Sequence, residues 1–221
     1  MNLKTRLILF SSFLTIAIVL TILFISNHFS MQMAHDMAQE EMEKMTHDVE
    51  EAIKLYVDEK KLQALTLANN KLVKGFLTTG ANRAEVKDLL ATTFNQYKQF
   101  ENVFVADSTG HIRIMGDGVK GEGLDIKVFP FWRLHNDNVD HHLDKVIYKS
   151  PVTGRMVTVM AARINDASGK FIGLIGMPLE WSMFAQDHIN SIKLKKTGYV
   201  TVMDHKHQFI SHPQEKLLLT A

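Results

Sequence analysis

One uninterrupted apolar stretch near the N-terminus constrains this chain more than any other feature. No charged residue lies between Leu7 and Ile25, and Lys4 and Arg6 come just before that stretch. A helix needs roughly 20 apolar residues to cross a bilayer core about 30 Å thick, so the sequence predicts a transmembrane helix over residues 7–27. The residues after it are polar and patterned like a globular domain, which predicts a domain anchored in a lipid bilayer.

The flanks of the apolar stretch favour a retained anchor over a cleaved signal peptide. A signal peptide has a shorter apolar core, about 7–15 residues, followed by a cleavage site of small residues, whereas this run ends in Ser-Asn-His-Phe at residues 26–29. Basic residues before the run and acidic ones such as Asp36 and Glu40 after it place residues 1–6 in the cytoplasm. The predicted location is the inner (plasma) membrane, with the domain in the periplasm or outside the cell.

Composition and motifs exclude several classes of function. The net charge of the chain is only +1. A nucleic-acid-binding domain normally has a basic face, so we expect no nucleic-acid partner. The chain also has no cysteine. The sequence contains neither a G-x-S-x-G elbow nor a glycine motif that binds phosphate. We therefore expect no catalytic residues, no cofactor and no enzymatic activity.

A stretch rich in histidine, aspartate and asparagine, His135–Asp144, is the densest cluster of metal-ligating residue types. Imidazole and carboxylate groups suit zinc or nickel, but the zincin motif H-E-x-x-H is missing and such residues are common in exposed loops. We expect an exposed loop with no metal site, while the sequence leaves metal binding there open.

A long helix is expected to continue outward from the membrane. Residues 30–77 contain no proline, and their first glycine is Gly75, so a helix is predicted there that ends at Gly80-Ala81-Asn82. Apolar residues within it follow the a/d spacing of a coiled coil, namely Ala38, Met42, Met45, Val49, Ala52 and Tyr56. This face either forms a homodimer or packs on the chain's own domain. A second helix with apolar residues at helical spacing follows, between Val86 and Tyr97.

After Phe100 the apolar period changes to that of strands. Strands are predicted at residues 102–107, 111–115, 145–148, 156–164 and 170–177, with a short helix or turn at residues 129–134 and a helix at residues 181–192. These elements describe an α+β domain on an antiparallel five-stranded sheet. Residues 198–204 and 208–213 repeat the first hairpin pattern, so a second module is expected to start near residue 193.

The order and spacing of these segments resemble a double Cache sensor. This extracytoplasmic ligand-binding module has two PAS-like sheets and occurs in chemoreceptors, sensor histidine kinases and some cyclic-dinucleotide enzymes. The segments that carry the resemblance are the anchor with its long helix, Val103–Asp107 with Ser-Thr-Gly after it, Asp125–Trp132, Val146–Tyr148 with Pro151–Gly154 after it, Gly173–Met177, and Gly198–Asp204 with His212-Pro213. It implies a stalk and second helix at residues 28–100, a membrane-distal PAS-like module at residues 101–192, and the start of a membrane-proximal module at residues 193–221.

The resemblance also implies a ligand site in the distal module, under the loop and helix of residues 116–138. Family members that bind amino acids share an arginine two residues before an aromatic pair, a tyrosine on the next strand and an aspartate ending the fifth strand. Here the pair is Phe131-Trp132 and the tyrosine is Tyr148, but Phe129 stands at the arginine position and Pro178 at the aspartate position. An α-amino acid would leave both its charges unpaired in a dry pocket.

We therefore expect a site with aromatic walls for an apolar small molecule, or a cation cage, rather than a site for an ordinary amino acid. The expected ligand-binding residues are Phe129, Phe131, Trp132, Tyr148 and Ser150. Each aromatic residue could instead only fill the core. The identity of the ligand does not follow from the sequence.

Three functions fit this reading. The resemblance favours the sensory region of a methyl-accepting chemotaxis receptor, in which ligand binding shifts helices across the membrane. A histidine kinase or diguanylate cyclase is the alternative output, and a membrane-anchored structural protein with a dimerising stalk is the alternative of another class. A receptor requires a second span and a cytoplasmic output domain, which we expect beyond residue 221, so the chain is read as a fragment or a truncated protein.

Overall fold

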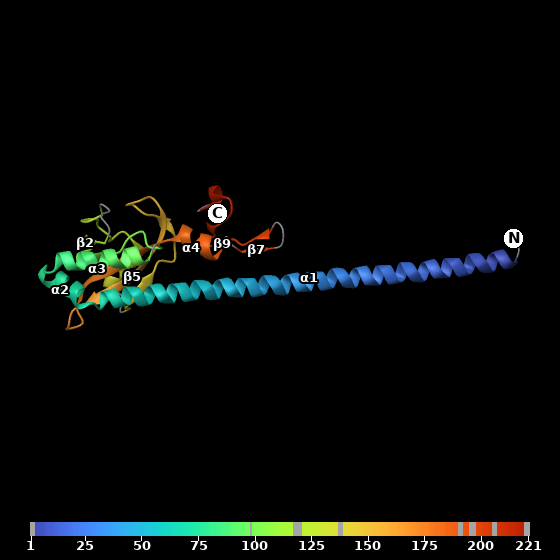
Figure 1. The fold of residues 1–221 in the computed structure, drawn as a ribbon, viewed down its shortest axis with the longest axis horizontal. Helices are drawn as coiled ribbons and strands as arrows, with labels where there is room; N and C mark the ends of the chain where they lie inside the picture. Colours follow the sequence, from blue (N-terminus) through green and yellow to red (C-terminus); the bar gives the residue numbers. More distant parts are fainter. Residues whose placement is uncertain are drawn as a thin grey trace. The chain divides into compact units, whose positions relative to one another are not determined.

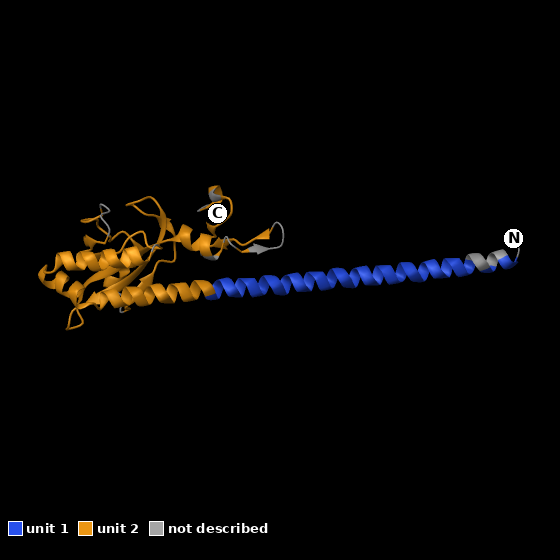
Figure 2. Ribbon diagram, in the orientation of Figure 1, with its two compact units in different colours: residues 1–51 blue, residues 52–221 orange. Residues whose placement is uncertain are grey.

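The computed structural model describes residues 3–97, 99–116, 121–136, 139–189, 192–194, 198–204 and 207–218 (Figure 1). The chain divides into two compact units, residues 1–51 and residues 52–221 (Figure 2). The described residues of the first unit are helical, whereas the second unit contains the sheet and the remaining helices.

Helix α1, Leu3–Ala68, contains the predicted span. Among the residues that the structure describes, it is the one helix long and apolar enough to cross a membrane, as judged by length and composition. The hydroxyls of Thr15 and Thr21 each donate to the carbonyl four residues earlier, at 2.8 Å. Polar groups in a bilayer must be satisfied within the segment, so these threonines are compatible with a span.

The predicted helix over residues 30–77 is interrupted, and its continuity was predicted wrongly. Helix α1 ends at Ala68, and helix α2, Lys71–Thr79, begins after Asn70. The Asn70 side chain accepts a hydrogen bond from the Leu72 amide at 2.9 Å. Asparagine is a preferred N-cap because its side chain satisfies an amide that the helix leaves free, and here this cap starts a new helix.

The break predicted at residues 80–82 is confirmed. Gly80 ends α2 with φ = 74°, and its amide donates to the Phe76 carbonyl. Glycine adopts this left-handed conformation without steric cost. Helix α3, Arg83–Gln96, follows, in agreement with the second predicted helix.

The predicted antiparallel sheet is present in the second unit, with strand order β2-β1-β6-β5-β3 and β4 paired to β5. The strands are β1 Phe104–Asp107, β2 Ile112–Met115, β3 His141–Leu143, β4 Tyr148–Lys149, β5 Met156–Asn165 and β6 Phe171–Glu180. The single strand predicted at residues 145–148 is wrong, because two short strands stand in its place. Asp144 turns its side chain inward between them, and residues 145–147 leave the ladder.

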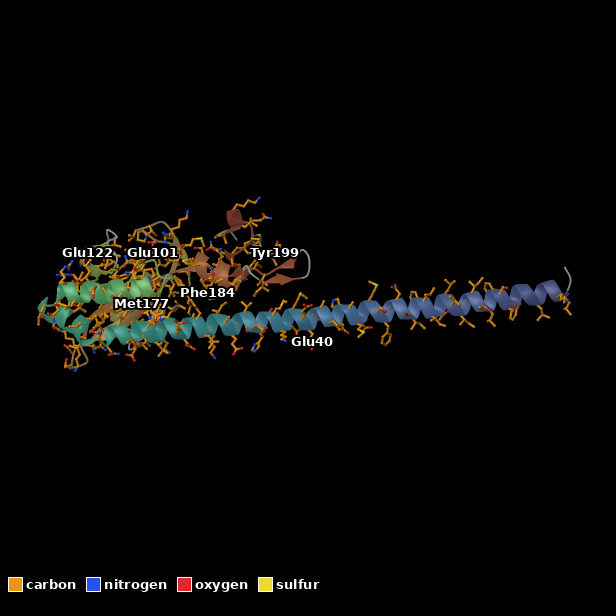
Figure 3. All side chains as sticks on the ribbon, viewed as in Figure 1. Glu40, Glu101, Glu122, Met177, Phe184 and Tyr199 are labelled. Atoms are coloured by element: carbon orange, nitrogen blue, oxygen red, sulfur yellow. The ribbon has the colours of Figure 1, made fainter. Side chains whose placement is uncertain are left out.

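Successive residues of a strand point to opposite faces of a sheet, and both faces are buried here. The helix face carries Val103, Val105, Ile114, Met160, Ala162, Ile164, Ile175 and Met177, which form one core with residues of α1, α2 and α3. The η1 face carries Phe104, Ala106, Ile112, Val159, Ala161 and Leu174, which form another core with the 3-10 helix η1, Pro130–His135. Figure 3 labels Met177 within the helix-face core. The short helix predicted at residues 129–134 is thus confirmed.

The last part of the chain packs on the end of the sheet domain. Helix α4, Trp181–His188, is shorter than the predicted helix over residues 181–192. It carries Phe184, which is labelled in Figure 3. The centroid of the Phe184 ring lies 4.5 Å from that of Tyr56 of α1. The elements after it are β7 Lys193–Leu194, β8 Gly198–Tyr199, β9 Val202–Met203, β10 Phe209–Ser211 and the 3-10 helix η2, Glu215–Leu217. Strands β9 and β10 pair antiparallel, while β8 pairs with β7.

Candidate functional site

A small cavity lies in the η1-face core, with a volume of about 40 Å³. Its floor is the sheet, its cover is η1 with the segment before it, and its side is the turn after β4. The lining residues are Glu101, Asn102, Phe104, Ile112, Met115, Leu124, Ile126, Phe129, Phe131, Tyr148, Ser150, Pro151, Val152, Val157, Val159 and Pro178. A buried water needs roughly 10–15 Å³ of such space, so the cavity has room for only a few water-sized groups.

The cover of the cavity is a stack of aromatic rings. The Phe129 ring is stacked on Phe131, with 5.6 Å between the ring centroids, and on Tyr148, at 5.7 Å. Phe131 also approaches Phe104 of the sheet, at 6.2 Å. Pro130 at the first position of η1 fixes the backbone between the two phenylalanines. Aromatic faces carry partial negative charge, so this wall favours apolar or cationic groups.

The polar groups on the cavity wall are mainly hydrogen-bond acceptors. Glu101 is only 6% exposed, and among the described residues that line the cavity it is the one charged side chain. It accepts a hydrogen bond from the Thr153 hydroxyl. Ser150 is also buried, and its Oγ accepts from the amides of Val152 and Thr153 at 3.2 and 3.4 Å. The wall thus has negative polarity.

Behind the wall, a buried acid supports the tyrosine. The Tyr148 hydroxyl donates to Asp144 Oδ2 at 3.0 Å, and Asp144 Oδ1 lies 3.2 Å from His142 Nε2. Asp144 is 4% exposed. Burial raises the pKa of Asp144 to about 7, although the Tyr148 hydrogen bond and the Arg133 charge act to lower it. Burial and the charges of Asp144 and Glu101 raise the pKa of Tyr148, which therefore stays neutral.

The structure brings together four of the five expected ligand-binding residues. Phe129, Phe131, Tyr148 and Ser150 line the cavity, whereas Trp132 does not. The Trp132 ring stacks on His135 at 4.7 Å and meets Phe171 edge-on at 6.0 Å. A 3-10 helix turns about 120° per residue, so neighbours in η1 cannot share one side, and Trp132 serves the core beside the cavity.

Sequence reasoning missed the polar residues that precede β1. Glu101 and Asn102 reach the cavity because the Glu101 amide donates to the Pro178 carbonyl at 2.8 Å, which attaches this segment to β6. Pro178, expected only as a missing aspartate, also lines the cavity. No local motif marks these contacts, because they depend on the pairing of segments far apart in the chain.

The exposed loop expected at residues 135–144 was also predicted wrongly in part. His141 and His142 belong to β3, and Asp144 is buried beside Tyr148. Asp137 and Asn138 lie outside the described residues. Within the part of the chain that the structure describes, no group of three or more histidine and acidic side chains is placed to hold a metal ion.

Comparison with protein families and solved structures gives consistent matches. The family model described as Cache domain matches residues 30–220. The ligand-binding domain of the Pseudomonas fluorescens chemoreceptor CtaA in complex with L-serine is similar, with a TM-score of 0.61 and 19% identity over 78% of this chain and 71% of that one. The sensor domain of the V. cholerae histidine kinase DctB gives a TM-score of 0.66 and 14% identity over 81% and 68%.

A domain of a sensory box/GGDEF family protein from Vibrio parahaemolyticus gives a TM-score of 0.64 and 12% identity, over 82% of this chain and 74% of that one. A comparison with curated protein sequences found no match. At these identities the solved structures establish the shared fold, while the family model covers most of the chain.

Proposed function

Because this chain belongs to the Cache domain family, we propose that it senses a small organic cation outside the membrane and reports it to a cytoplasmic output domain. Cache domains are extracytoplasmic, ligand-binding sensors of membrane receptors. The observation that carries the proposal is the cavity of the η1 face, where aromatic rings and one buried acid, Glu101, form the wall.

The charges at the cavity argue against an ordinary amino acid as ligand. The relative CtaA was solved with L-serine and with L-isoleucine. In the present chain an amino acid's carboxylate would meet Glu101 and aromatic faces, with no arginine or lysine among the described lining residues. A like charge in a dry site costs several kcal/mol. An alkylammonium group would instead meet the Glu101 carboxylate, the Ser150 hydroxyl and aromatic rings.

The size of the cavity suggests how binding becomes a signal. At about 40 Å³ it cannot accept a ligand of several carbon atoms unless its cover moves. We propose that the parts that move are η1, which Arg163 of β5 holds by a hydrogen bond to the Leu134 carbonyl at 2.9 Å, and the turn at residues 150–153. A ligand shifts a conformational equilibrium by its difference in affinity for the two states, so an outward position of η1 would be the state that the ligand favours.

A buried lysine of α1 packs on Phe100, the residue that precedes Glu101 of the cavity. Lys60 of α1 is 1% exposed, and its Nζ lies 5.0 Å from the ring centroids of Tyr56 and Tyr97 and 5.4 Å from that of Phe100. Lys60 Nζ also contacts Glu59 at 2.9 Å. Phe100 directly precedes Glu101 of the cavity. A displacement of Glu101 would therefore move Phe100 against α1, the helix that contains the predicted span.

The output class is a finer proposal. We favour a methyl-accepting chemotaxis receptor that dimerises through α1, because chemoreceptor domains recur among the similar structures. A histidine kinase or a diguanylate cyclase remains the alternative, and domains of both kinds share the fold. Identification of the cytoplasmic output domain would decide between these outputs.

Thermal unfolding of the full chain in detergent tests ligand class directly, because a ligand stabilises the state it binds. We expect small alkylammonium ions to raise the melting temperature at pH 7, and the corresponding amino acids and carboxylic acids to leave it unchanged. Phe129→Leu should remove that shift. Val128→Ala, at the exposed neighbouring position, should keep it. Stabilisation by amino acids alone would refute the cation proposal.

A further inference from the structure

The part of α1 that follows the predicted span is rich in sulfur and imidazole groups. Five of the twelve methionines of the chain lie within residues 31–45. Met31, Met33, Met37 and Met42 are 51–67% exposed. Methionine is among the residues most often buried, and a dimer along the a/d spacing would cover Met31 and Met42 but not Met33 and Met37.

Three of these metal-ligating side chains lie on one side of the helix. An α-helix turns 100° per residue, so His28, Met31 and His35 fall within an arc of about 60°. Met31 and His35 are four residues apart, which places their Cβ atoms about 5–6 Å from each other. All three side chains are exposed. His35 Nδ1 lies 3.9 Å from Asp36 Oδ1, so the other ring nitrogen, Nε2, is the one that would bind a metal ion.

We propose that His28, Met31 and His35 form a binding site for a soft monovalent metal ion, Ag⁺ or Cu⁺. Thioether sulfur is a soft ligand that suits Cu⁺ better than calcium or magnesium, and imidazole binds copper well. Monovalent copper and silver accept two or three ligands, so one helix face is sufficient. Met31 and His35 supply the central pair, and His28 lies one turn before Met31.

The position of this face gives the site a consequence for signalling. His28, Met31 and His35 continue the a/d spacing of Ala38, Met42, Met45 and Val49 toward the membrane. A metal ion bound there would fix side chains at the point where α1 leaves the predicted bilayer. The site is remote in sequence from the cavity-lining residues, and metal binding does not depend on the proposed organic ligand.

Calorimetric titration of the full chain in detergent with silver nitrate, in chloride-free buffer, tests the proposal. We expect a tight site for one Ag⁺ per chain, which Met31→Leu/His35→Gln weakens at least tenfold. Circular dichroism should give the same helix content for the wild type and for Met31→Leu/His35→Gln. An equimolar amount of Zn²⁺ should not displace Ag⁺, because Zn²⁺ usually takes four ligands from imidazole, carboxylate and thiolate groups, and this face offers two imidazoles and a thioether.

The matched control replaces the same two residue types at positions from which the two side chains cannot reach one metal ion. Met42 and His47 are five residues apart, about 140° around the helix, so Met42→Leu/His47→Gln should bind Ag⁺ within twofold of the wild type. The proposal is overturned if Met31→Leu/His35→Gln retains the wild-type affinity, if both double variants lose affinity equally, or if Zn²⁺ displaces the silver.

Discussion

The two faces of the one sheet differ in what they bury. The helix face is covered by α1, α2 and α3 and carries aliphatic side chains such as Met160 and Ile175. The η1 face is covered by a short 3-10 helix and contains aromatic rings, a cavity and the buried acids Glu101 and Asp144.

This difference separates stability from recognition within a single domain. Close packing of aliphatic groups gives most of the stabilisation of a core, and each void reduces it. The helix face follows that rule, whereas the η1 face keeps a void and desolvated acids. A sheet with one tightly packed face can hold the other face in place as a ligand site.

Neighbouring residues of β5 offer the strongest test of this contrast. Met160 is fully buried on the helix face, and Val159 lines the cavity. Met160→Ala should lower the free energy of unfolding by about 2–5 kcal/mol and leave alkylammonium affinity unchanged. Val159→Ala should cost less stability and change the affinity. Denaturant unfolding and calorimetry measure both quantities, and equal effects of the two substitutions would contradict the contrast.

Gly176 of β6 gives a second test of the contrast between the two faces. It leaves space for the ring of Phe104, which lines the cavity. A Cβ atom at this position would lie 2.1 Å from Cζ of the Phe104 ring. Gly176→Ala should push Phe104 toward the cavity, weaken ligand binding, and cost about 1–3 kcal/mol through overpacking. Gly75→Ala is the control, since nothing lies within 4 Å of a Cβ there and alanine favours the α2 helix. Unchanged binding by Gly176→Ala would argue against a site beside Phe104.

The buried acid of the η1 face predicts a dependence of stability on pH. The pKa of Asp144 rises from 3.8 to about 7 on folding, so its favourable contribution is complete below about pH 3.8 and is lost as the pH rises through about 7. Relative to the wild type, Asp144→Asn should therefore gain about 2–3 kcal/mol of stability as the pH rises from 5 to 8.

His142 Nε2 lies 3.2 Å from the Asp144 carboxyl group, and the Arg133 charge and the Tyr148 hydrogen bond act to lower the pKa of Asp144. Denaturant unfolding at several pH values measures the stability of both proteins. A stability difference between Asp144→Asn and the wild type that is constant from pH 5 to pH 8 would show that Asp144 does not titrate in this range.

The smallest expected effect concerns Lys60, which packs against Phe100 of the helix-face core. Lys60→Met replaces a buried cation with an apolar side chain of similar length, so stability should be unchanged or slightly higher. Ligand affinity should stay within about twofold. Hydrogen exchange should then show less ligand-induced protection in residues 52–68 of α1 than in the wild type. Protection equal to that of the wild type would exclude Lys60 as the connection to α1.

Much of the fold follows from local patterns in the sequence. The uncharged run before Ser26, the alternation in Val103–Asp107 and the proline at position 130 predict their elements because each depends on neighbours in the chain. The interruption at Asn70 was missed, since an asparagine can also lie within a helix and only its capping hydrogen bond distinguishes the two cases.

The candidate site was less predictable, because cavity walls are assembled from distant segments. Tyr148 and Phe129 were identified through a family resemblance and their aromatic character. Glu101 was not, since its place depends on the hydrogen bond with Pro178 across the sheet. Trp132 was expected at the cavity because a sequence does not give the rotation of a 3-10 helix around its axis.

The central claim, that the η1 face selects a cation through Glu101, is tested most directly by one pair of ligands and one substitution. Isobutylammonium and isobutanol have nearly the same shape and differ in charge. Calorimetry with the wild-type chain should show at least tenfold tighter binding of the ammonium ion, about 1.4 kcal/mol, and Glu101→Gln should remove most of that preference. An equal preference in the wild type and in Glu101→Gln would contradict the account.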